Sequence, residues 1–159
     1  MSITPRKLPL LATAAVLALA TSFASAQTAE RGTREEAKAM TEAALAHIKK
    51  VGHEQAFNDF TKDKANWTKK DLYVFTYDLK ANLLSHGANE KLIGKNLYEL
   101  KDQNGKQFMK DVVELAVGKG EGWVDYDWTN PTTKKVEGKS TYVRRIPGWD
   151  GGVSVGVYR

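Results

Sequence analysis

The sequence predicts an α+β domain in which a long N-terminal helix packs on a five-stranded antiparallel sheet, with the helices on one face. A change of periodicity indicates this fold class. Apolar residues recur at steps of three and four between residues 33 and 60, whereas segments from residue 72 onward alternate with a period of two. Glycine clusters and the pairs Asn130-Pro131 and Asp150-Gly151 separate the later segments, as turns do between antiparallel strands.

The first 26 residues have the organisation of a secretory signal peptide. Arg6 and Lys7 precede an apolar run from Leu8 to Ala20, and Ala24-Ser25-Ala26 fits the A-x-A cleavage pattern. A membrane-anchoring helix is the alternative, but it needs about 20 consecutive apolar residues, and proline and threonine interrupt this run. We therefore predict that residues 1–26 are a cleaved signal peptide and that the protein is periplasmic or secreted.

The rest of the chain is predicted to form one domain. Residues 27–32 are small and polar, so we expect a disordered lead there. Residues 33–159 are enough to bury a single hydrophobic core. No later stretch is apolar enough to cross a bilayer, and strand-like sequence continues to the last residue. We expect no transmembrane segment after signal cleavage and no output domain.

Composition argues against several classes of function. The 159-residue chain has no cysteine, which excludes disulfides, covalent haem attachment, iron–sulfur ligation and cysteine nucleophiles. The net charge of +5 arises from basic residues interspersed with acidic ones, whereas nucleic-acid binding favours a clustered basic stripe. The histidines have no carboxylates at metal-site spacing, and no serine stands in a Gly-x-Ser-x-Gly elbow. We therefore expect no enzymatic activity, cofactor, metal or nucleic-acid partner.

Two helices are predicted before any strand. Thr33 and Glu36 have the spacing of a capping box, and Gly52 ends the first helix. A second helix follows from about His53, with Trp67 just beyond its end. The apolar positions that define the first helix are Ala37, Met40, Ala44, Ile48 and Val51.

The remaining elements are two strands, a helix and a three-stranded meander. The helix, near Phe108–Ala116, crosses between the two halves of the sheet and leaves room for a cavity beside it. We expect Asp150-Gly151 to supply the positive φ angles of a tight hairpin turn between the last two strands. The predicted strands are Leu72–Asp78, Asn82–His86, Trp123–Trp128, Lys139–Ile146 and Gly152–Tyr158.

Several ordered motifs resemble those of the single Cache domain of the second type. They are the segments 73–78 (YVFTYD), 85–87 (SHG), 92–96 (LIGKN), 120–128 (GEGWVDYDW) and 155–158 (VGVY). The resemblance implies an extracytoplasmic, PAS-like sensor fold that binds small carboxylates such as acetate, pyruvate or propionate. Most relatives of this kind are chemoreceptors or sensor kinases.

The candidate ligand site centres on a strand pair. Tyr126 and Trp128 share one face of their strand, and each has an apolar body with a donor at its tip. Lys139, at the start of the next strand, can bring a positive charge near them, and the resemblance implies that these positions face the ligand cavity. The alternative is that the aromatic residues are core and that the lysine is solvated. His86 matches a histidine of the family, and it either donates to the anion or fixes the covering loop.

Three more tyrosines are candidates for the ligand site. Tyr73 and Tyr77 are two apart on the first strand, so they lie on one face, although core packing suits at least one of them. Tyr142 shares a face with Arg144, which is a reserve cation should Lys139 prove exposed.

Two functions follow from these observations. The first is a periplasmic sensory module that binds a small organic anion without catalysis. The second is an interaction module that docks a membrane-bound sensor or channel, with the cavity filled by side chains. A small cone-shaped α+β enzyme suits the sequence less well, because Asp125 and Asp127 lie on the strand face opposite Tyr126 and no other acid–base pair stands out.

Overall fold

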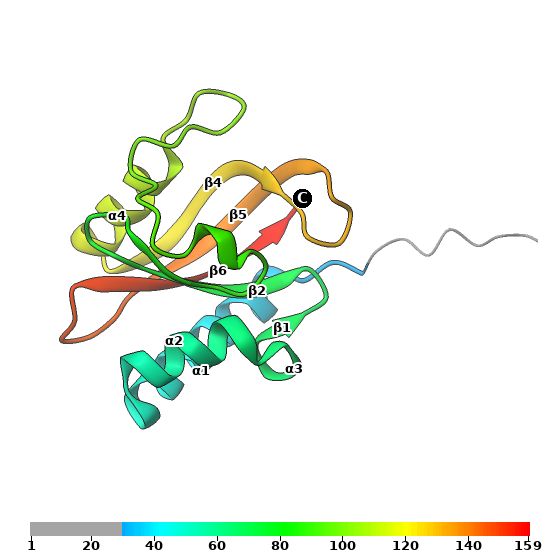
Figure 1. Ribbon diagram of the computed structural model, residues 1–159. Helices are drawn as coiled ribbons and strands as arrows, with labels where there is room; N and C mark the ends of the chain where they lie inside the picture. The colour runs from blue at the N-terminus through cyan, green and yellow to red at the C-terminus, as the bar shows by residue number, and fades with distance from the viewer. Residues whose placement is uncertain (1–29) are drawn as a thin grey trace, which may run out of the picture.

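The computed structural model, which describes residues 30–159, has helices on both faces of one antiparallel sheet (Figure 1). The predicted signal peptide, residues 1–26, lies outside the described residues. None of the helices formed by residues 30–159 has the length and apolarity that a bilayer crossing needs.

The first two helices begin where the sequence predicts. Helix α1, Arg34–Val51, starts at a capping box in which the Thr33 hydroxyl accepts from the Glu36 N–H and the Glu36 carboxylate accepts from the Thr33 N–H. Gly52 ends α1 at a positive φ of 86°, which glycine adopts without steric cost, and it also precedes α2, His53–Lys62. A four-residue helix, α3, Lys64–Trp67, follows.

The sheet has six strands in the order β1-β2-β6-β5-β4, and β3 also pairs with β2. All pairings are antiparallel, and β4, β5 and β6 form the predicted meander. The predicted α+β class is confirmed, although the two-residue strand β1 was not expected. The strands are β1 Thr68–Lys69, β2 Leu72–Asp78, β3 Leu83–His86, β4 Glu121–Thr129, β5 Val136–Arg145 and β6 Gly151–Tyr158, with a short 3₁₀ turn η1 at Glu90–Leu92 and helix α4 at Phe108–Gly118.

The expectation that the helices share one face is wrong. Helices α1 and α2 cover one side of the sheet, where Val74 and Val155 belong to their hydrophobic cluster. Helix α4 covers the other side and packs with Phe75 and Tyr126 (Figure 1). Six consecutive residues of β2, from Leu72 to Tyr77, are buried, so side chains on both faces of this strand need a cover.

The turn between β5 and β6 also differs from the expectation. Positive φ falls on Gly148, at 71°, and not on Gly151. Gly151 is instead the first residue of β6, and a Cβ there would lie 2.3 Å from the backbone oxygen of Tyr77. The glycine is required by close packing against the neighbouring strand.

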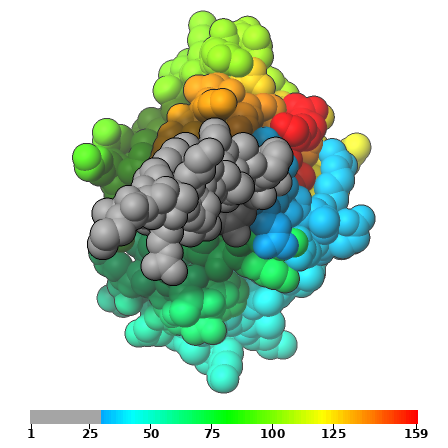
Figure 2. All heavy atoms as spheres, turned by 90° about the vertical axis from the view of Figure 1, so that its right-hand side faces the viewer, coloured from blue at the N-terminus to red at the C-terminus, as the bar shows by residue number. Residues whose placement is uncertain are grey.

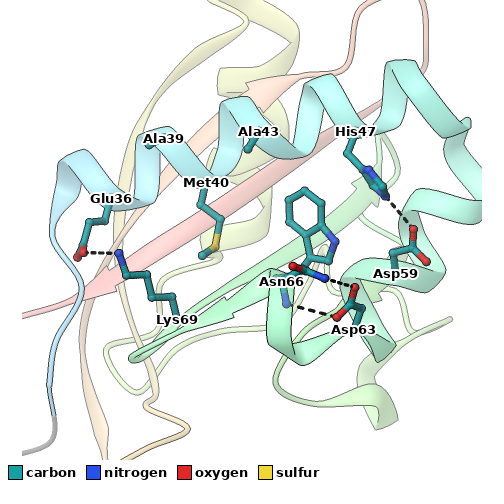
Figure 3. A pocket seen from close by; sticks show the side chains of 10 residues that line it. Glu36, Ala39, Met40, Ala43, His47, Asp59, Asp63, Asn66 and Lys69 are labelled. Atoms are coloured by element: carbon teal, nitrogen blue, oxygen red, sulfur yellow. Dashed lines mark hydrogen bonds and ion pairs between the residues drawn. The ribbon is translucent and has the colours of Figure 1, made fainter.

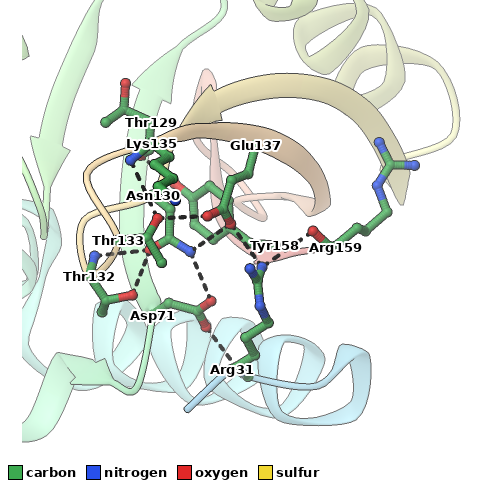
Figure 4. A network of polar contacts seen from close by, with 11 residues as sticks. Arg31, Asp71, Thr129, Asn130, Thr132, Thr133, Lys135, Glu137, Tyr158 and Arg159 are labelled. Atoms are coloured by element: carbon green, nitrogen blue, oxygen red, sulfur yellow. Dashed lines mark hydrogen bonds and ion pairs between the residues drawn. The ribbon is translucent and has the colours of Figure 1, made fainter. Parts of the chain in front are cut away.

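The start of the described chain is held by the turn before β2, by β5 and by the last residue, whose backbone oxygen accepts from Arg31 at 3.3 Å. The Gly32 N–H donates to Asp71 at 2.7 Å, and the Arg31 guanidinium pairs with Glu137 at 2.8 Å (Figure 4). Figure 2 shows the C-terminal residues next to the beginning of α1. Arg31 and Gly32, part of the segment expected as a disordered lead, therefore make defined contacts with the domain.

Candidate functional site

A buried lysine lies at the centre of the candidate site. Lys139 stands on β5 opposite Tyr126 of β4 on one side and Tyr158 of β6 on the other, and it is 1% exposed. Its ammonium group donates a hydrogen bond to the Tyr73 hydroxyl at 2.7 Å. Because Tyr73 is on β2, the lysine side chain reaches across β6.

Four aromatic rings surround the Lys139 ammonium group. Its Nζ lies 4.3 Å from the ring centre of Tyr73, 5.1 Å from that of Tyr158 and 5.4 Å from that of Phe75. The Tyr126 ring centre is 5.9 Å away. These distances are within the roughly 6 Å over which a ring face attracts a cation. We call this group, Tyr73, Phe75, Tyr126 and Tyr158, the aromatic cage.

The aromatic cage offers no anionic partner to the lysine. Within residues 30–159 the only hydrogen bond of its ammonium group is to Tyr73. Burial lowers the pKa of Lys139 to about 7, and the negative charge of Asp71 raises it only in part. Asp71 is itself occupied, because it accepts from Gly32 and from Asn130 (Figure 4). Among residues 30–159, Lys139 is therefore a buried amine that is not paired with a carboxylate, and its lowered pKa leaves it partly protonated near pH 7.

A cavity of about 380 Å³ lies next to the aromatic cage. Tyr73 belongs to both, since its side chain lines the cavity while its hydroxyl accepts from Lys139. Lys139 itself is not part of the wall. The wall is formed by the ends of β2, β3 and β4 and by the loops after β3 and β4: Tyr73, His86, Ala88, Asn89, Leu92, Trp128, Thr129, Pro131 and Lys134.

His86 lines the cavity and also fixes the loop that borders it. Its Nδ1 accepts from the backbone N–H groups of Ala88 at 3.2 Å and Asn89 at 2.9 Å. Burial, with a smaller contribution from the nearby Lys139, lowers the pKa of His86 to about 3, so the ring is neutral. Because Nδ1 accepts, the ring proton is on Nε2, which is a donor. Both roles left open by the sequence are thus compatible with the geometry.

The structure brings together only some of the predicted residues. Tyr73, His86 and Trp128 line the cavity, and Tyr126 and Lys139 lie in the adjoining cage. Tyr126 also stacks on Phe108 of α4 and its hydroxyl bonds Thr141 at 2.9 Å, so it has a packing role as well. Its buried hydroxyl has a raised pKa because of desolvation and stays neutral.

Tyr77 and Tyr142 lie elsewhere. Tyr77 is fully buried, and its hydroxyl bonds Ser154 rather than facing the cavity. Tyr142 is on the opposite face of β5, where its hydroxyl donates to Glu121 at 2.8 Å. Arg144 shares that face and pairs with Glu42 and Glu121. The alternation of β5 separates both residues from Lys139, because positions three or five apart on a strand point to opposite sides.

Two cage residues were not among the predicted site residues. Phe75 and Tyr158 were included in the sequence analysis only as members of the segments 73–78 and 155–158. The hairpin register of β5 and β6 is the signal for Tyr158, because counting outward from the turn places it opposite Lys139. No local signal predicts Phe75, since its contact with Lys139 depends on β2 lying beside β6.

A second hollow lies between α1 and the segment α2–α3 (Figure 3). Its volume is about 550 Å³, and Met40, Ala43 and Trp67 form its apolar part. Its polar groups have partners within the described chain: Glu36 pairs with Lys69 at 3.0 Å and His47 bonds Asp59 at 2.7 Å. This groove therefore lacks the unpaired buried charge that marks the aromatic cage. No cluster of three or more potential metal ligands occurs in the part of the chain that the structure describes.

The comparison with known protein families gives a match along most of the chain. Residues 13–159 match the family described as Single Cache domain 2. The chain belongs to this family. The predicted resemblance is confirmed, and the protein contains a Cache domain, the sensory ligand-binding module of chemotaxis and sensor proteins.

Solved structures and curated relatives agree with this assignment. A methyl-accepting chemotaxis protein from Vibrio parahaemolyticus superposes with a TM-score of 0.65 at 27% identity, over 78% of this chain and 86% of that chain. A Cache chemosensory domain studied for carboxylic acid recognition superposes with a TM-score of 0.67 at 23% identity, over 78% of this chain and 91% of that chain. The latter likeness shows the fold alone.

Two curated relatives are signalling proteins. The chain is 30% identical over 88 residues to the methyl-accepting chemotaxis protein McpP of Pseudomonas putida, and 30% identical over 89 residues to the sensor histidine kinase MctS of Rhizobium johnstonii. The matched regions are 55% and 56% of this chain but only 16% and 19% of those relatives. The chain thus spans less than a fifth of each relative's length.

Proposed function

We propose that this Cache domain is a periplasmic sensory module that binds a small carboxylate, such as acetate, pyruvate or propionate, in the cavity beside Tyr73. The observation that carries this proposal is the buried Lys139, which has four aromatic neighbours and, among residues 30–159, no ion pair with a carboxylate. A buried charge without a partner is costly, and a bound anion next to it removes much of that cost.

The hydrogen bonds around Tyr73 support a route from Lys139 to the ligand. The Tyr158 hydroxyl donates its only proton to the carbonyl of Thr129 at 2.8 Å, so it has none left for Tyr73. Tyr73 accepts from Lys139 and keeps its own proton, which can point to Tyr158 at 3.2 Å or into the cavity. A carboxylate there would accept this proton, and the adjacent ammonium group strengthens the bond.

Other wall residues complete a carboxylate site. The Nε2–H of His86 and the indole N–H of Trp128 are further donors on the cavity wall. Leu92 and Pro131 add apolar surface, which suits the short hydrocarbon part of such a ligand. Anion binding in proteins needs this combination of donors that replace lost hydration and walls that exclude water.

The similar proteins support both the ligand class and the location. One structural neighbour is a Cache domain that recognises carboxylic acids, and another, with a TM-score of 0.62 at 25% identity, is the periplasmic sensor domain of a chemotaxis protein. The predicted signal peptide at residues 1–26 is consistent with export to that compartment.

Thermal denaturation with added ligand tests the proposal. Acetate, pyruvate, propionate and lactate are titrated separately, with chloride at matched ionic strength as the reference. At a free concentration of 100 times Kd, a ligand stabilises the domain by about 2.7 kcal/mol, so Tm rises with concentration. Lys139→Met, which keeps the side-chain length and removes the charge, is expected to weaken binding by roughly tenfold or more.

Matched substitutions on the other face of the sheet serve as controls. Lys38→Met removes an exposed lysine near Tyr142, and Tyr142→Phe removes the hydroxyl that bonds Glu121. Both variants are expected to keep the wild-type response. A flat Tm across a broad carboxylate panel would reject the proposal in favour of a docking module, and an unchanged affinity in Lys139→Met would remove the lysine from the site.

A further inference from the structure

The last strand contains a glycine whose backbone conformation does not require glycine. Gly156 lies within β6, pairs with Thr141 of β5, and is absent from the positive-φ residues of the described chain. A glycine inside a strand weakens it, because it has no side chain to pack and loses more entropy on folding. Such a glycine usually marks a place where another group comes close to the backbone.

The group that comes close to Gly156 is the side chain of Lys139. A Cβ at position 156 would lie 2.1 Å from Cε of Lys139 and 3.1 Å from its Cδ. It would also lie 2.5 Å from Oγ1 of Thr141. The aliphatic part of Lys139 therefore rests directly on the bare backbone of Gly156.

This contact determines where the ammonium group goes. Lys139 is on β5 and Tyr73 is on β2, and β6 lies between those strands. Neighbouring strands are about 4.8 Å apart, so the lysine must cross the intervening strand close to its surface to reach the tyrosine hydroxyl. At Gly156 nothing projects from the strand, and the side chain passes there to its 2.7 Å contact with Tyr73.

We propose that Gly156 is a positioning residue of the anion site: its missing side chain opens the path along which Lys139 reaches the aromatic cage and Tyr73. This inference rests on the proposed function only for its effect on ligand binding. The placement of the lysine can be measured without any ligand. Gly156→Ala is expected to force Lys139 out of the cage, although alanine itself suits the extended backbone.

Nuclear magnetic resonance of the protein with isotope-labelled lysine tests the placement directly. In the wild type, the Cε–Hε signal of Lys139, assigned by its loss in Lys139→Met, is expected to be strongly shifted by the four surrounding rings. In Gly156→Ala that signal should move to the position of exposed lysines. If it keeps its wild-type shift, the inference is overturned.

Ligand binding and stability supply two further measurements. Gly156→Ala should weaken carboxylate binding at least tenfold. Gly138→Ala should leave binding unchanged, because a Cβ there meets only the flexible end of Arg159, at 3.0 Å. If Gly156→Ala binds carboxylates as the wild type does, the positioning role is excluded. If the wild type binds none, the proposed function fails while the lysine signal still decides the position of Lys139.

A double-mutant cycle covers the case in which Gly156→Ala does not fold. The stability loss caused by this substitution should be much smaller in a Lys139→Ala background, where the obstructing chain is gone. The crowding by Thr141 is present in both backgrounds and cancels. An equal loss in the two backgrounds, or no folding in either, would show that Gly156 serves the strand alone and would overturn the inference.

Discussion

The two faces of the sheet are built from the same strands but are chemically different. Towards α1 and α2 the strands present an apolar surface that includes Val74, Val153, Val155 and Val157. Towards α4 the alternate residues of β6 are Ser154, Gly156 and Tyr158, and Lys139 and Thr141 of β5 lie beside them. The first face packs apolar side chains under the helices, whereas the second encloses buried polar groups, among them Lys139, whose ammonium group donates to Tyr73.

The helices that cover the two faces also differ in how completely they cover them. Helices α1 and α2 together cover their face, and the hollow of Figure 3 lies between α1 and the segment α2–α3. Helix α4 has 11 residues and covers its face in part, and the loops after β3 and β4 border the remaining cavity. Side-chain alternation thus lets an apolar face and a face with buried polar groups share the same strands.

The largest loss of stability is expected from placing a lysine on the apolar face. Val155→Lys puts a charge where Val155 is 0% exposed and packs in the cluster under α1 and α2. We expect a loss of stability on the order of 4 kcal/mol, because the surrounding cluster is apolar and the hydroxyl of Tyr142, the partner of Val155 on β5, already donates to Glu121. Urea unfolding measures this loss. Val155→Met is the size-matched control and should cost clearly less; equal losses would mean that charge is not what distinguishes the faces.

The buried Lys139 on the face towards α4 should make the stability of the domain depend on pH. Burial lowers its folded-state pKa to about 7, from an ordinary value of 10.5. Between these values the unfolded chain binds more protons than the folded one, so stability should rise with pH, by at most about 1.4 kcal/mol per pH unit. Urea midpoints at pH 7, 8 and 9 test this in the unliganded protein.

Lys139→Met provides the reference for that titration, and the difference between it and the wild type isolates the lysine. Carboxylate affinity should change in the opposite direction, weakening by up to about tenfold per pH unit above pH 7, since the anion needs the charged form. A wild type and Lys139→Met with parallel stability curves would show that the lysine keeps its charge in the fold.

A smaller effect is expected from His86 in acid. Burial lowers the pKa of His86 from 6.5 to about 3, so its contribution to stability is present above pH 6.5 and is lost as pH falls towards 3. At pH 5 the loss is about 2 kcal/mol at most. His86→Asn keeps an acceptor for the N–H groups of Ala88 and Asn89 and should show a shallower acid dependence. Identical acid profiles would contradict a buried, neutral imidazole.

The predictability of the candidate site follows from how far apart its parts are along the chain. Tyr126 and Lys139 face each other across one hairpin, so motif and alternation place them together. Tyr142 looked equivalent to them by residue type, yet its odd spacing from Lys139 puts it on the other face. Tyr73 is 66 residues from Lys139, and only the pairing of β2 with β6 makes the contact of these two side chains possible.

The sequence by itself determined the three longer helices, the longer strands and the Cache family, because periodicity, capping residues and turn glycines act over a few neighbouring positions. The tertiary structure alone decided that α4 covers the opposite face, that β6 lies between β2 and β5, and that Lys139 crosses Gly156. The physical reason is that strand order and cover depend on burying apolar surfaces from distant segments together, and no local pattern records which distant surface is the partner.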